Sequence, residues 1–225
     1  MDKFTRGFLY GLCLGDGCLY KQPTNKNVGL TVGHGPKQLA YLMHKAEKLR
    51  SVFGGKPIKT YEYTSCNKSS GKKYTNFQIR KVDSYFNQMH KKLYQTGKKV
   101  FTREVLDFLT DEGLAYWFMD DGSGSVSKNK QGNLCGCMLR IATYFSKEEA
   151  EIVAKWFLDK YGFIVKFDID KRSNKVSIRF GTHDSIALAK ILQPYIIPEM
   201  EYKIKDVLNY TPRVLGPVNT GEDIV

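Results

Sequence analysis

The sequence predicts an α+β protein made of two αββαββα halves related by a pseudo-two-fold axis, each with its own antiparallel sheet. Three observations support this fold class. The same order of apolar, alternating and helical segments occurs twice in the chain. The extended segments come in pairs joined by polar turns, as at residues 67–73, and each copy opens on an apolar helix that stops at Asp-Gly. Paired strands favour this arrangement over a repeated βαβ unit.

The first copy begins with the apolar run FLYGLCLGDG, in which Leu9, Leu12 and Cys13 recur at helical spacing. Alternating stretches around residues 28–32 predict strands, and residues 37–53 predict a helix. Extended segments at residues 56–63 and 74–80 and a helix over residues 82–94 follow, and then the lysine pair Lys98 and Lys99.

The second copy begins with GLAYWFMDDG and continues through an alternating stretch at residues 138–144. A helix is predicted over residues 146–161, where SKEE has the pattern of a capping box. Extended segments at residues 165–169 and 176–180, a helix over residues 183–192 and Lys203 complete the copy. The separation of Asp121 from Lys203 matches that of Asp16 from Lys99 to within one residue, as expected for a duplicated body.

These segments divide the chain into four parts. Residues 1–97 form the first half, 98–112 a linker, 113–205 the second half and 206–225 a tail. We expect the tail to be loose because Pro212, Gly216 and Pro217 interrupt regular structure there.

Composition restricts the class of protein and of partner. The 225 residues are 42% hydrophobic, enough to bury one large core or two small ones. The formal net charge of +12 favours a polyanionic partner, because lysine and arginine contacts to phosphates release condensed counterions. No run reaches the roughly 18 apolar residues of a membrane span, so we expect no membrane partner, and the N-terminus has no pattern of a signal peptide.

The cysteines and histidines are not arranged as catalytic or metal-binding sets. Five cysteines at irregular spacing argue against a disulfide framework and against a zinc site, and favour an intracellular, reducing compartment, the cytoplasm or an organelle matrix. The four histidines show no spacing typical of a shared site, and we assign them no role.

Each apolar helix is expected to end at an aspartate. Gly17 and Gly122 suit left-handed C-terminal caps, which would put Asp16 and Asp121 at the carboxyl ends of the two helices. The helix dipole disfavours a carboxylate at that end, and two such carboxylates close together repel. Divalent cations would relieve both penalties, so a functional pair is indicated.

Small residues on the first helix match large ones on the second. If the helices pack along the pseudo-two-fold axis, Gly11 should face Tyr116 and Gly15 should face Asp120. The helices are therefore expected to be complementary rather than symmetric.

With these motifs in place, the chain resembles the LAGLIDADG homing endonuclease family in its single-chain, two-motif form. The signature lies over residues 9–17 as LYGLCLGDG and over residues 114–122 as LAYWFMDDG. Leu14 and Met119 stand where the family name has its first Asp, a departure that concerns helix packing. The resemblance covers roughly residues 4–205. It implies a curved antiparallel sheet in each half and halves that pack through the two LAGLIDADG helices.

The resemblance also implies the chemistry. Asp16 and Asp121 would be the metal-binding acids, with the carbonyls of Gly15 and Asp120 completing the coordination of Mg²⁺, or Mn²⁺ in its place. Lys99 and Lys203 match the family's basic active-site residues. The implied reaction is a metal-dependent double-strand break across the minor groove of a long, non-palindromic DNA site, leaving short 3′ overhangs. A metal-activated water suits phosphodiester hydrolysis.

The predicted strands alternate apolar side chains with side chains that read base edges in the major groove. For example, Phe77 and Ile79 should face the core, with Gln78 and Arg80 outward, and Val165 and Phe167 should face it in the second half. The residues expected to contact DNA are Lys21, Gln22, Lys26, Lys59, Tyr61, Asn76, Gln78, Arg80, Arg140, Tyr144, Lys166, Asp168, Ser177 and Arg179.

Two other functions use the same scaffold. An RNA-binding intron maturase would use the basic surface, with intron RNA as its partner, and a noncatalytic DNA-binding regulator would need neither aspartate. Both aspartates and both lysines are present, which favours cleavage of double-stranded DNA by a monomer. An intein-embedded form is not expected, because 225 residues leave no room for a splicing domain.

Overall fold

The computed structural model describes residues 1–67, 70–95 and 97–211. The first half contains, in chain order, α1 (Lys3–Leu14), β1 (Cys18–Tyr20), β2 (Gly29–His34), the 3₁₀ helix η1 (Pro36–Gln38), α2 (Leu39–Phe53), β3 (Thr60–Cys66), β4 (Lys73–Val82) and α3 (Tyr85–Leu93). The helix expected from residue 82 begins at Tyr85, because Val82 still pairs with Gly29 in the sheet.

The second half repeats this order. It contains α5 (Asp111–Asp121), β5 (Gly122–Lys128), β6 (Leu134–Phe145), α6 (Lys147–Tyr161), β7 (Val165–Asp170), β8 (Lys175–Phe180) and α7 (Thr182–Leu192), followed by η2 (Gln193–Tyr195), η3 (Pro198–Lys203) and α8 (Lys205–Leu208). The four-stranded sheets have the orders β1-β2-β4-β3 and β5-β6-β8-β7, and all the pairs are antiparallel. The predicted αββαββα duplication is confirmed.

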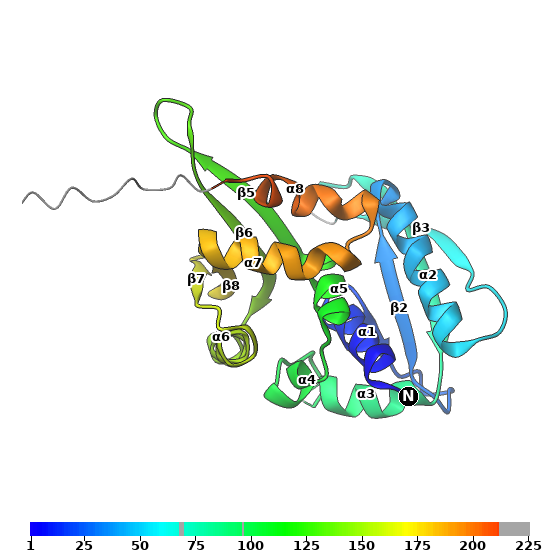
Figure 1. Ribbon diagram of the computed structural model, residues 1–225. Coiled ribbons are helices and arrows are strands. Elements are labelled where there is room, and N and C mark those ends of the chain that lie inside the picture. Colours follow the sequence, from blue (N-terminus) through cyan, green and yellow to red (C-terminus); the bar gives the residue numbers. More distant parts are fainter. Residues whose placement is uncertain (68–69, 96, 212–225) are drawn as a thin grey trace, which may run out of the picture.

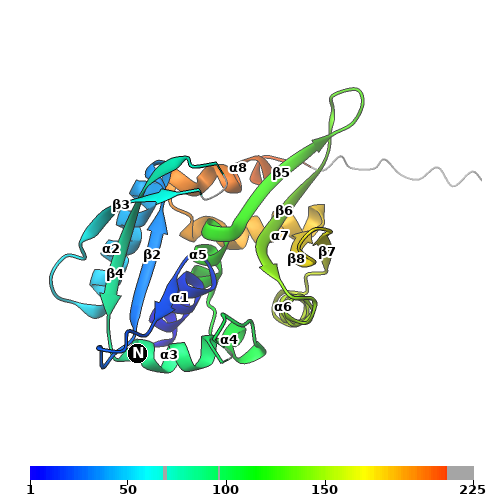
Figure 2. The same ribbon diagram turned by 180° about the vertical axis from the view of Figure 1, so that it is seen from behind.

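Helices α1 and α5 lie side by side at the centre of the molecule, between the two sheets (Figure 1). Their facing sides are lined by fully buried apolar residues, among them Phe8, Leu9, Leu12, Trp117 and Phe118. Helices α2 and α7 lie in front of the sheets in Figure 1, whereas β2, β4, β5 and β6 are in front in the reverse view of Figure 2. Both sheets therefore present their uncovered faces on the same side.

Glycines allow α1 and α5 to approach closely. A Cβ atom on Gly11 would overlap the carbonyl oxygen of Gly113, and one on Gly15 would overlap the Asp120 carboxylate. The expected contact of Gly15 with Asp120 is therefore confirmed. The expected contact of Gly11 with Tyr116 is wrong, because the Tyr116 ring packs on Phe8 with centroids 4.7 Å apart. Glycine backbones meet at the helix crossing instead.

The helix ends confirm one expectation and correct another. Ser146 and Glu149 form the predicted capping box at the start of α6. Neither Gly17 nor Gly122 adopts a positive φ, so the expected left-handed caps are wrong. A Cβ on Gly17 would overlap the Leu12 oxygen, and one on Gly122 the Phe118 oxygen. Glycine is needed at both positions for space rather than for handedness.

The segment expected as a linker contains a short helix, α4 (Arg103–Asp107), and is packed on the second half. The Phe101 ring packs tilted on Trp117, with ring centroids 5.6 Å apart, and edge-on against Phe145, with centroids 4.8 Å apart. In the segment expected as a loose tail, Val207 and Tyr210 are buried, so residues 206–210 belong to the folded body. The rest of that expectation, residues 212–225 with Pro212, Gly216 and Pro217, lies outside the described residues.

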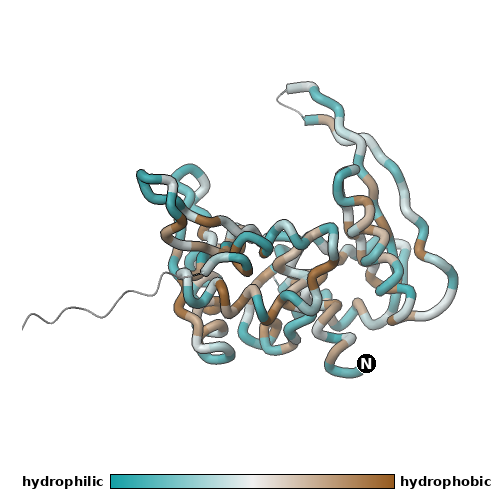
Figure 3. The backbone as a smooth tube through the Cα atoms, turned by 45° about the horizontal axis from the view of Figure 1, so that its top comes forward, coloured by the Kyte–Doolittle hydropathy of each residue, from teal (hydrophilic) through white to brown (hydrophobic). Residues whose placement is uncertain are grey.

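The hydrophobic segments gather inside the body of the molecule, while the hairpin tips and outer loops are mainly hydrophilic (Figure 3). Strand β7 departs from the expected pattern: Phe167 is 38% and Ile169 57% exposed. As the edge strand beyond β8, it is only partly covered by α6. Among the residues that the structure describes, no helix has the length and apolarity to cross a membrane.

Candidate functional site

The two motif aspartates lie at the same end of α1 and α5. Asp16 follows the C-cap residue of α1, Gly15, and Asp121 is the last residue of α5. The Asp16 side chain is 43% exposed. Burial, and then the nearby Asp120 carboxylate, raise the pKa of Asp16 to about 6. The Asp16 carboxylate therefore lacks sufficient positive charge around it.

The Asp121 carboxylate has a different set of neighbours. Burial is the main cause that raises its pKa, and a hydrogen bond from Thr143 opposes the shift. The Thr143 hydroxyl donates to Asp121 Oδ2 at 2.7 Å and accepts from the Trp117 indole at 2.9 Å. A neutral hydroxyl group therefore orients Asp121.

A buried cluster adjoins Asp16, and the sequence did not indicate it. The Asp16 backbone N–H donates to Asp120 Oδ2 at 2.9 Å, and the Lys45 ammonium donates to Asp120 Oδ1 at 2.5 Å. Lys45 also lies 2.8 Å from His34 Nε2. An ammonium can only donate, so Nε2 is the acceptor and the His34 Nδ1–H faces Asp16 Oδ2, 3.5 Å away.

The charges in this cluster oppose one another. Burial and then the Lys45 charge lower the pKa of His34 to about 4, which keeps the imidazole neutral. Burial also lowers the pKa of Lys45, and the Asp120 carboxylate raises it. The sequence analysis assigned His34 no role, and the structure places its imidazole between Lys45 and Asp16. A polar residue inside the buried face of β2 was the signal that could have revealed it.

Lys99 and Lys203 reach the helix ends. The Lys99 ammonium donates to the Gly15 carbonyl at 2.7 Å, and the Lys203 ammonium donates to the Met119 and Asp120 carbonyls at 2.5 and 3.1 Å. Burial lowers the pKa of Lys203, while Asp120 and Asp121 raise it. The main-chain carbonyls beside both motif aspartates therefore accept hydrogen bonds from lysine ammonium groups.

This donor set fits a divalent metal ion. The candidate ligands are carboxylate and carbonyl oxygens, which hard cations such as Mg²⁺ prefer. The side chains of Asp16, His34 and Asp120 also bring three ligand atoms within 4.8 Å of one another. Lys45 already neutralises Asp120, so Asp16 and Asp121 are the carboxylates that remain for an external cation.

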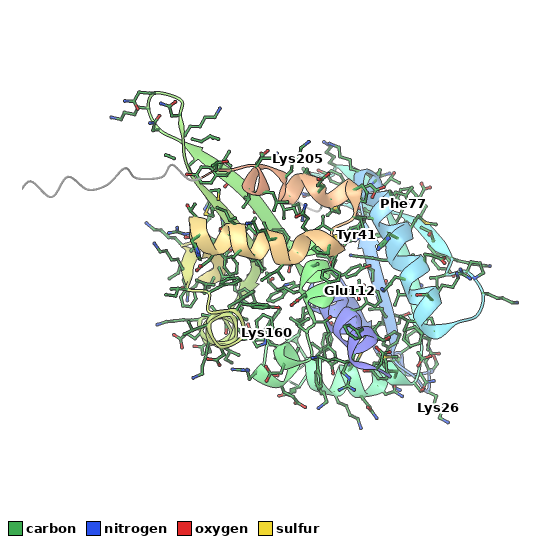
Figure 4. All side chains as sticks on the ribbon, in the orientation of Figure 1. Lys26, Tyr41, Phe77, Glu112, Lys160 and Lys205 are labelled. Atoms are coloured by element: carbon green, nitrogen blue, oxygen red, sulfur yellow. The ribbon has the colours of Figure 1, made fainter. Side chains whose placement is uncertain are left out.

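Four of the residues expected to contact DNA, Tyr61, Asn76, Gln78 and Arg80, stand on strands of the first sheet, and four more stand in loops next to its strands. Cross-strand pairing aligns Thr31 with Arg80 and Tyr61 with Gln78. A hollow of about 280 Å³ is lined by Tyr20, Gln22, Thr31, Gln78 and Arg80. Lys21, Lys26, Lys59 and Tyr61 are exposed, and Asn76 is half-buried. Lys26 lies on the loop at the bottom of the view in Figure 4.

In the second sheet the cations form a row across three strands. Arg140 pairs with Arg179, and Arg179 pairs with Lys166. Asp168 binds Arg179 at 2.8 Å and approaches Arg140 at 4.0 Å. Asp168 therefore holds Arg179 in place and partly offsets the charge of Arg140.

Two expected DNA contacts in the second half differ in exposure. Ser177 lies on the predicted face with Arg140 and Arg179, but it is only 2% exposed because Arg140 covers it and donates a hydrogen bond to its hydroxyl. Tyr144 is 59% exposed and adopts a φ of 59°, an uncommon conformation for a residue other than glycine. Its side chain is free to meet a partner.

The fold and the site together define a class: duplicated single-chain α+β proteins with one acidic helix end per half and two uncovered polar sheets. The model of the LAGLIDADG DNA endonuclease family matches residues 6–188. The match spans most of the chain, which therefore belongs to this family.

Three relatives are similar in sequence over most of this chain. The probable intron-encoded endonuclease 1 of Wickerhamomyces canadensis is 30% identical over 209 residues, 91% of this chain and 85% of that protein. The cytochrome b mRNA maturase bI2 of Debaryomyces hansenii is 29% identical over 217 residues, 91% of this chain and 74% of that protein. A RecA protein of Mycolicibacterium flavescens is 28% identical over 200 residues, 86% of this chain but only 44% of that protein.

Solved structures show the same fold. The homing endonuclease I-WcaI bound to its DNA recognition sequence has a TM-score of 0.75 and 27% identity, over 90% of this chain and 86% of that chain. I-DmoI in complex with DNA and Mn has a TM-score of 0.51 and 18% identity, over 87% and 99% of the chains, and supports the fold alone.

Proposed function

We propose that the chain is a site-specific homing endonuclease that makes a metal-dependent double-strand break in a long, non-palindromic DNA site. The observation that carries the proposal is the pair of motif aspartates at adjacent helix ends, each beside a carbonyl that accepts a hydrogen bond from the lysine that ends the same copy of the repeat. Paired acidic centres are what two phosphodiester cleavages require. Membership of the family and the DNA-bound relative I-WcaI support it.

Asp16 and Asp121 would hold the metal, with the carbonyls of Gly15 and Asp120 as further ligands. A bound Mg²⁺ or Mn²⁺ would activate water and neutralise charge on the scissile phosphate. The raised pKa values of Asp16 and Asp121 support this assignment, since a cation between them would relieve the cost of burying two carboxylates.

Lys99 and Lys203 would supply fixed positive charge beside the reacting phosphates. Each ammonium is held by carbonyl groups at a helix end, so it needs little reorganisation when a phosphate arrives. Lys203 is only 9% exposed, and its charge is therefore less screened by water than that of a surface lysine.

The two uncovered sheet faces would bind the duplex on either side of the cleavage centres. Lys, Arg, Gln and Asn side chains on these faces suit base edges in the major groove. Because the two halves carry different side chains, we propose that one monomer recognises an asymmetric site. We further propose that cleavage leaves short 3′ overhangs. We also propose that residues 1–97 and 113–205 are the two recognition units, joined by residues 98–112.

Asp16→Asn and Asp121→Asn test the proposal. Each variant should lose double-strand cleavage by at least about a hundredfold, because the neutral amide is a poor ligand and cannot balance the metal charge. Binding to the same duplex, followed by gel shift in Ca²⁺, should be retained. Full cleavage activity in either variant would contradict the assignment of the aspartates.

A second candidate, an intron maturase, is favoured by one relative, the maturase bI2 at 29% identity. In this case the basic faces would bind intron RNA, and splicing assistance would not depend on the aspartates. An in vitro splicing assay with wild type and Asp121→Asn separates the two functions. Splicing by both proteins, together with no DNA cleavage by wild type, would support the maturase and exclude the endonuclease.

A further inference from the structure

The two cleavage centres have different internal supports. Lys45 of α2 is fully buried, lies 4.0 Å from the centroid of the Tyr41 ring and forms an ion pair with Asp120 of the other half. Figure 4 shows Tyr41 at the side of α2 that faces the central helices. At the matching place on α6, the fully buried residue is Val153. The ion pair therefore exists on one side of the pseudo-two-fold axis.

Asp120 uses both of its carboxylate oxygens. Oδ1 accepts from Lys45, and Oδ2 accepts from the backbone N–H of Asp16. That N–H has left the helical ladder, because the Leu12 oxygen accepts instead from Gly17 at 2.9 Å. The residue that fixes the Asp16 backbone thus comes from the opposite half of the chain.

Asp121 is held in another way. It is the last residue of α5, so its own backbone is part of a regular helix. Its carboxylate is oriented by Thr143 rather than by an ion pair. Gly15, the counterpart of Asp120, has no side chain that could grip the Asp121 backbone.

Stability does not explain the ion pair. Burying two charges costs several kcal/mol per ion, and apolar residues of similar volume often serve as well or better. The second half uses such a residue, Val153, at the matching place. A role in positioning Asp16 explains why the first half keeps the buried Lys45–Asp120 ion pair where the second half has an apolar valine.

We infer that Lys45 and Asp120 are positioning residues that fix Asp16 through its backbone N–H, so that the two strand cuts depend on different supports. The inference rests on the proposed endonuclease function. It assigns Lys45 no contact with DNA or metal. Loss of the hydrogen bond from the Asp16 N–H to residue 120 should slow the cut made at the Asp16 centre and spare the other one.

A matched pair of variants isolates the hydrogen bond. Lys45→Met alone leaves a buried unpaired carboxylate and is expected to fold poorly. Lys45→Met/Asp120→Asn and Lys45→Met/Asp120→Ala both lack the buried charges, but only the asparagine keeps an acceptor for the Asp16 N–H. We expect similar unfolding midpoints for the two double variants, which separates positioning from folding.

The readout is the ratio of the two single-strand cleavage rates on an end-labelled duplex. In the alanine variant this ratio should change by about tenfold or more, since small misplacement of a reacting group has effects of this size. In the asparagine variant it should stay near the wild-type ratio. Thr143→Val, which removes the hydrogen bond to Asp121, should shift the ratio in the opposite direction.

A measurement on the metal-free protein is independent of catalysis. The Asp16 amide proton should be protected from exchange in wild type and in the asparagine variant, and should lose protection in the alanine variant. Equal strand ratios and equal Asp16 protection in both double variants would overturn the inference. Absence of any cut by wild type would instead contradict the proposed function.

Discussion

The carboxyl end of α1 and the carboxyl end of α5 hold equivalent aspartates in unequal surroundings. Asp16 is approached by an imidazole, His34, and its backbone is held by Asp120. Asp121 is approached by the hydroxyl of Thr143. In both halves the neighbour comes from the second strand of the sheet, so the backbone framework repeats while the chemistry does not.

The difference shows that the two copies of a duplicated chain can support their aspartates in separate ways. Gly15 of α1 makes room for the Asp120 side chain of α5, which a symmetric pair of helices could not do. As a result, Asp120 can reach across to Asp16 while nothing reaches back to Asp121 in the same way. The predictions below test this asymmetry, from the largest expected effect to the smallest.

The largest effect is expected from the two lysines. Lys99→Met and Lys203→Met should each lower cleavage by about a hundredfold or more, because each removes a fixed charge beside the reacting phosphates. The two variants should differ in stability: Lys203 is buried and bonds two carbonyls, whereas Lys99 is partly exposed and bonds one. Cleavage rates and thermal unfolding measure both effects.

Lys98→Met is the matched control, since Lys98 is exposed and adjoins Lys99 in the chain. It should cut at nearly the wild-type rate. An equal loss in Lys98→Met and Lys99→Met would mean that only net charge matters.

The helix crossing predicts the next effect. Gly11→Ala should destabilise the fold by about 3 kcal/mol, because its Cβ would overlap the Gly113 backbone and the two helices would have to separate. Gly35→Ala is the control: its Cβ would meet nothing within 4 Å. Urea unfolding should separate the two variants, and equal midpoints would show that the crossing tolerates a wider spacing.

The two sheet faces should differ in how their arginines respond. Arg80→Ala and Arg179→Ala should each relax one base position, at a cost of about 1–3 kcal/mol in binding if the contact is bidentate. Asp168→Ala should reproduce part of the Arg179 effect, since Asp168 holds that guanidinium. Cleavage preferences on a randomised target report these changes, and unchanged preferences would remove both arginines from the interface.

The smallest effect concerns the pH dependence of stability. The pKa of Asp16 is raised from an ordinary 3.8 to about 6, so between these values the folded metal-free chain binds more protons than the unfolded chain. This carboxylate therefore costs stability above pH 6, by about 1 kcal/mol after solvent screening, and the cost disappears as the pH falls toward 4.

Asp16→Asn should accordingly be more stable than wild type at pH 7 and equal to it near pH 4, measured by thermal unfolding in chelator. His34 acts in the opposite direction, because its lowered pKa of about 4 makes the fold lose stability as the pH falls below 6.5. A wild type more stable than the variant at pH 7 would contradict the raised pKa.

Much of the fold could be predicted because repetition and periodicity are properties of the sequence itself. The two motifs, the strand pairs and the Ser146 capping box all have local signals. The left-handed caps at Gly17 and Gly122 could not be distinguished from a steric need for glycine, because both favour the same residue.

The polar cluster was missed for a different reason. Lys45 stands in a helix with other lysines and has the composition of a solvated face, yet α2 buries it against α5. His34 ends a strand whose other buried residues are apolar. Ser177 was expected outward by alternation, but Arg140 covers it. Tertiary contacts, within a half for Ser177 and across the halves for Lys45, decide these placements, and no local pattern encodes them.

The most direct test of the central claim is cleavage of a randomised duplex library by the wild-type protein in Mg²⁺, with both product ends sequenced. Two unequal centres in one chain predict a single long, non-palindromic site, cut once on each strand with a short 3′ overhang, and no cutting in chelator. Palindromic products, or no product at all in Mg²⁺ or Mn²⁺, would contradict it.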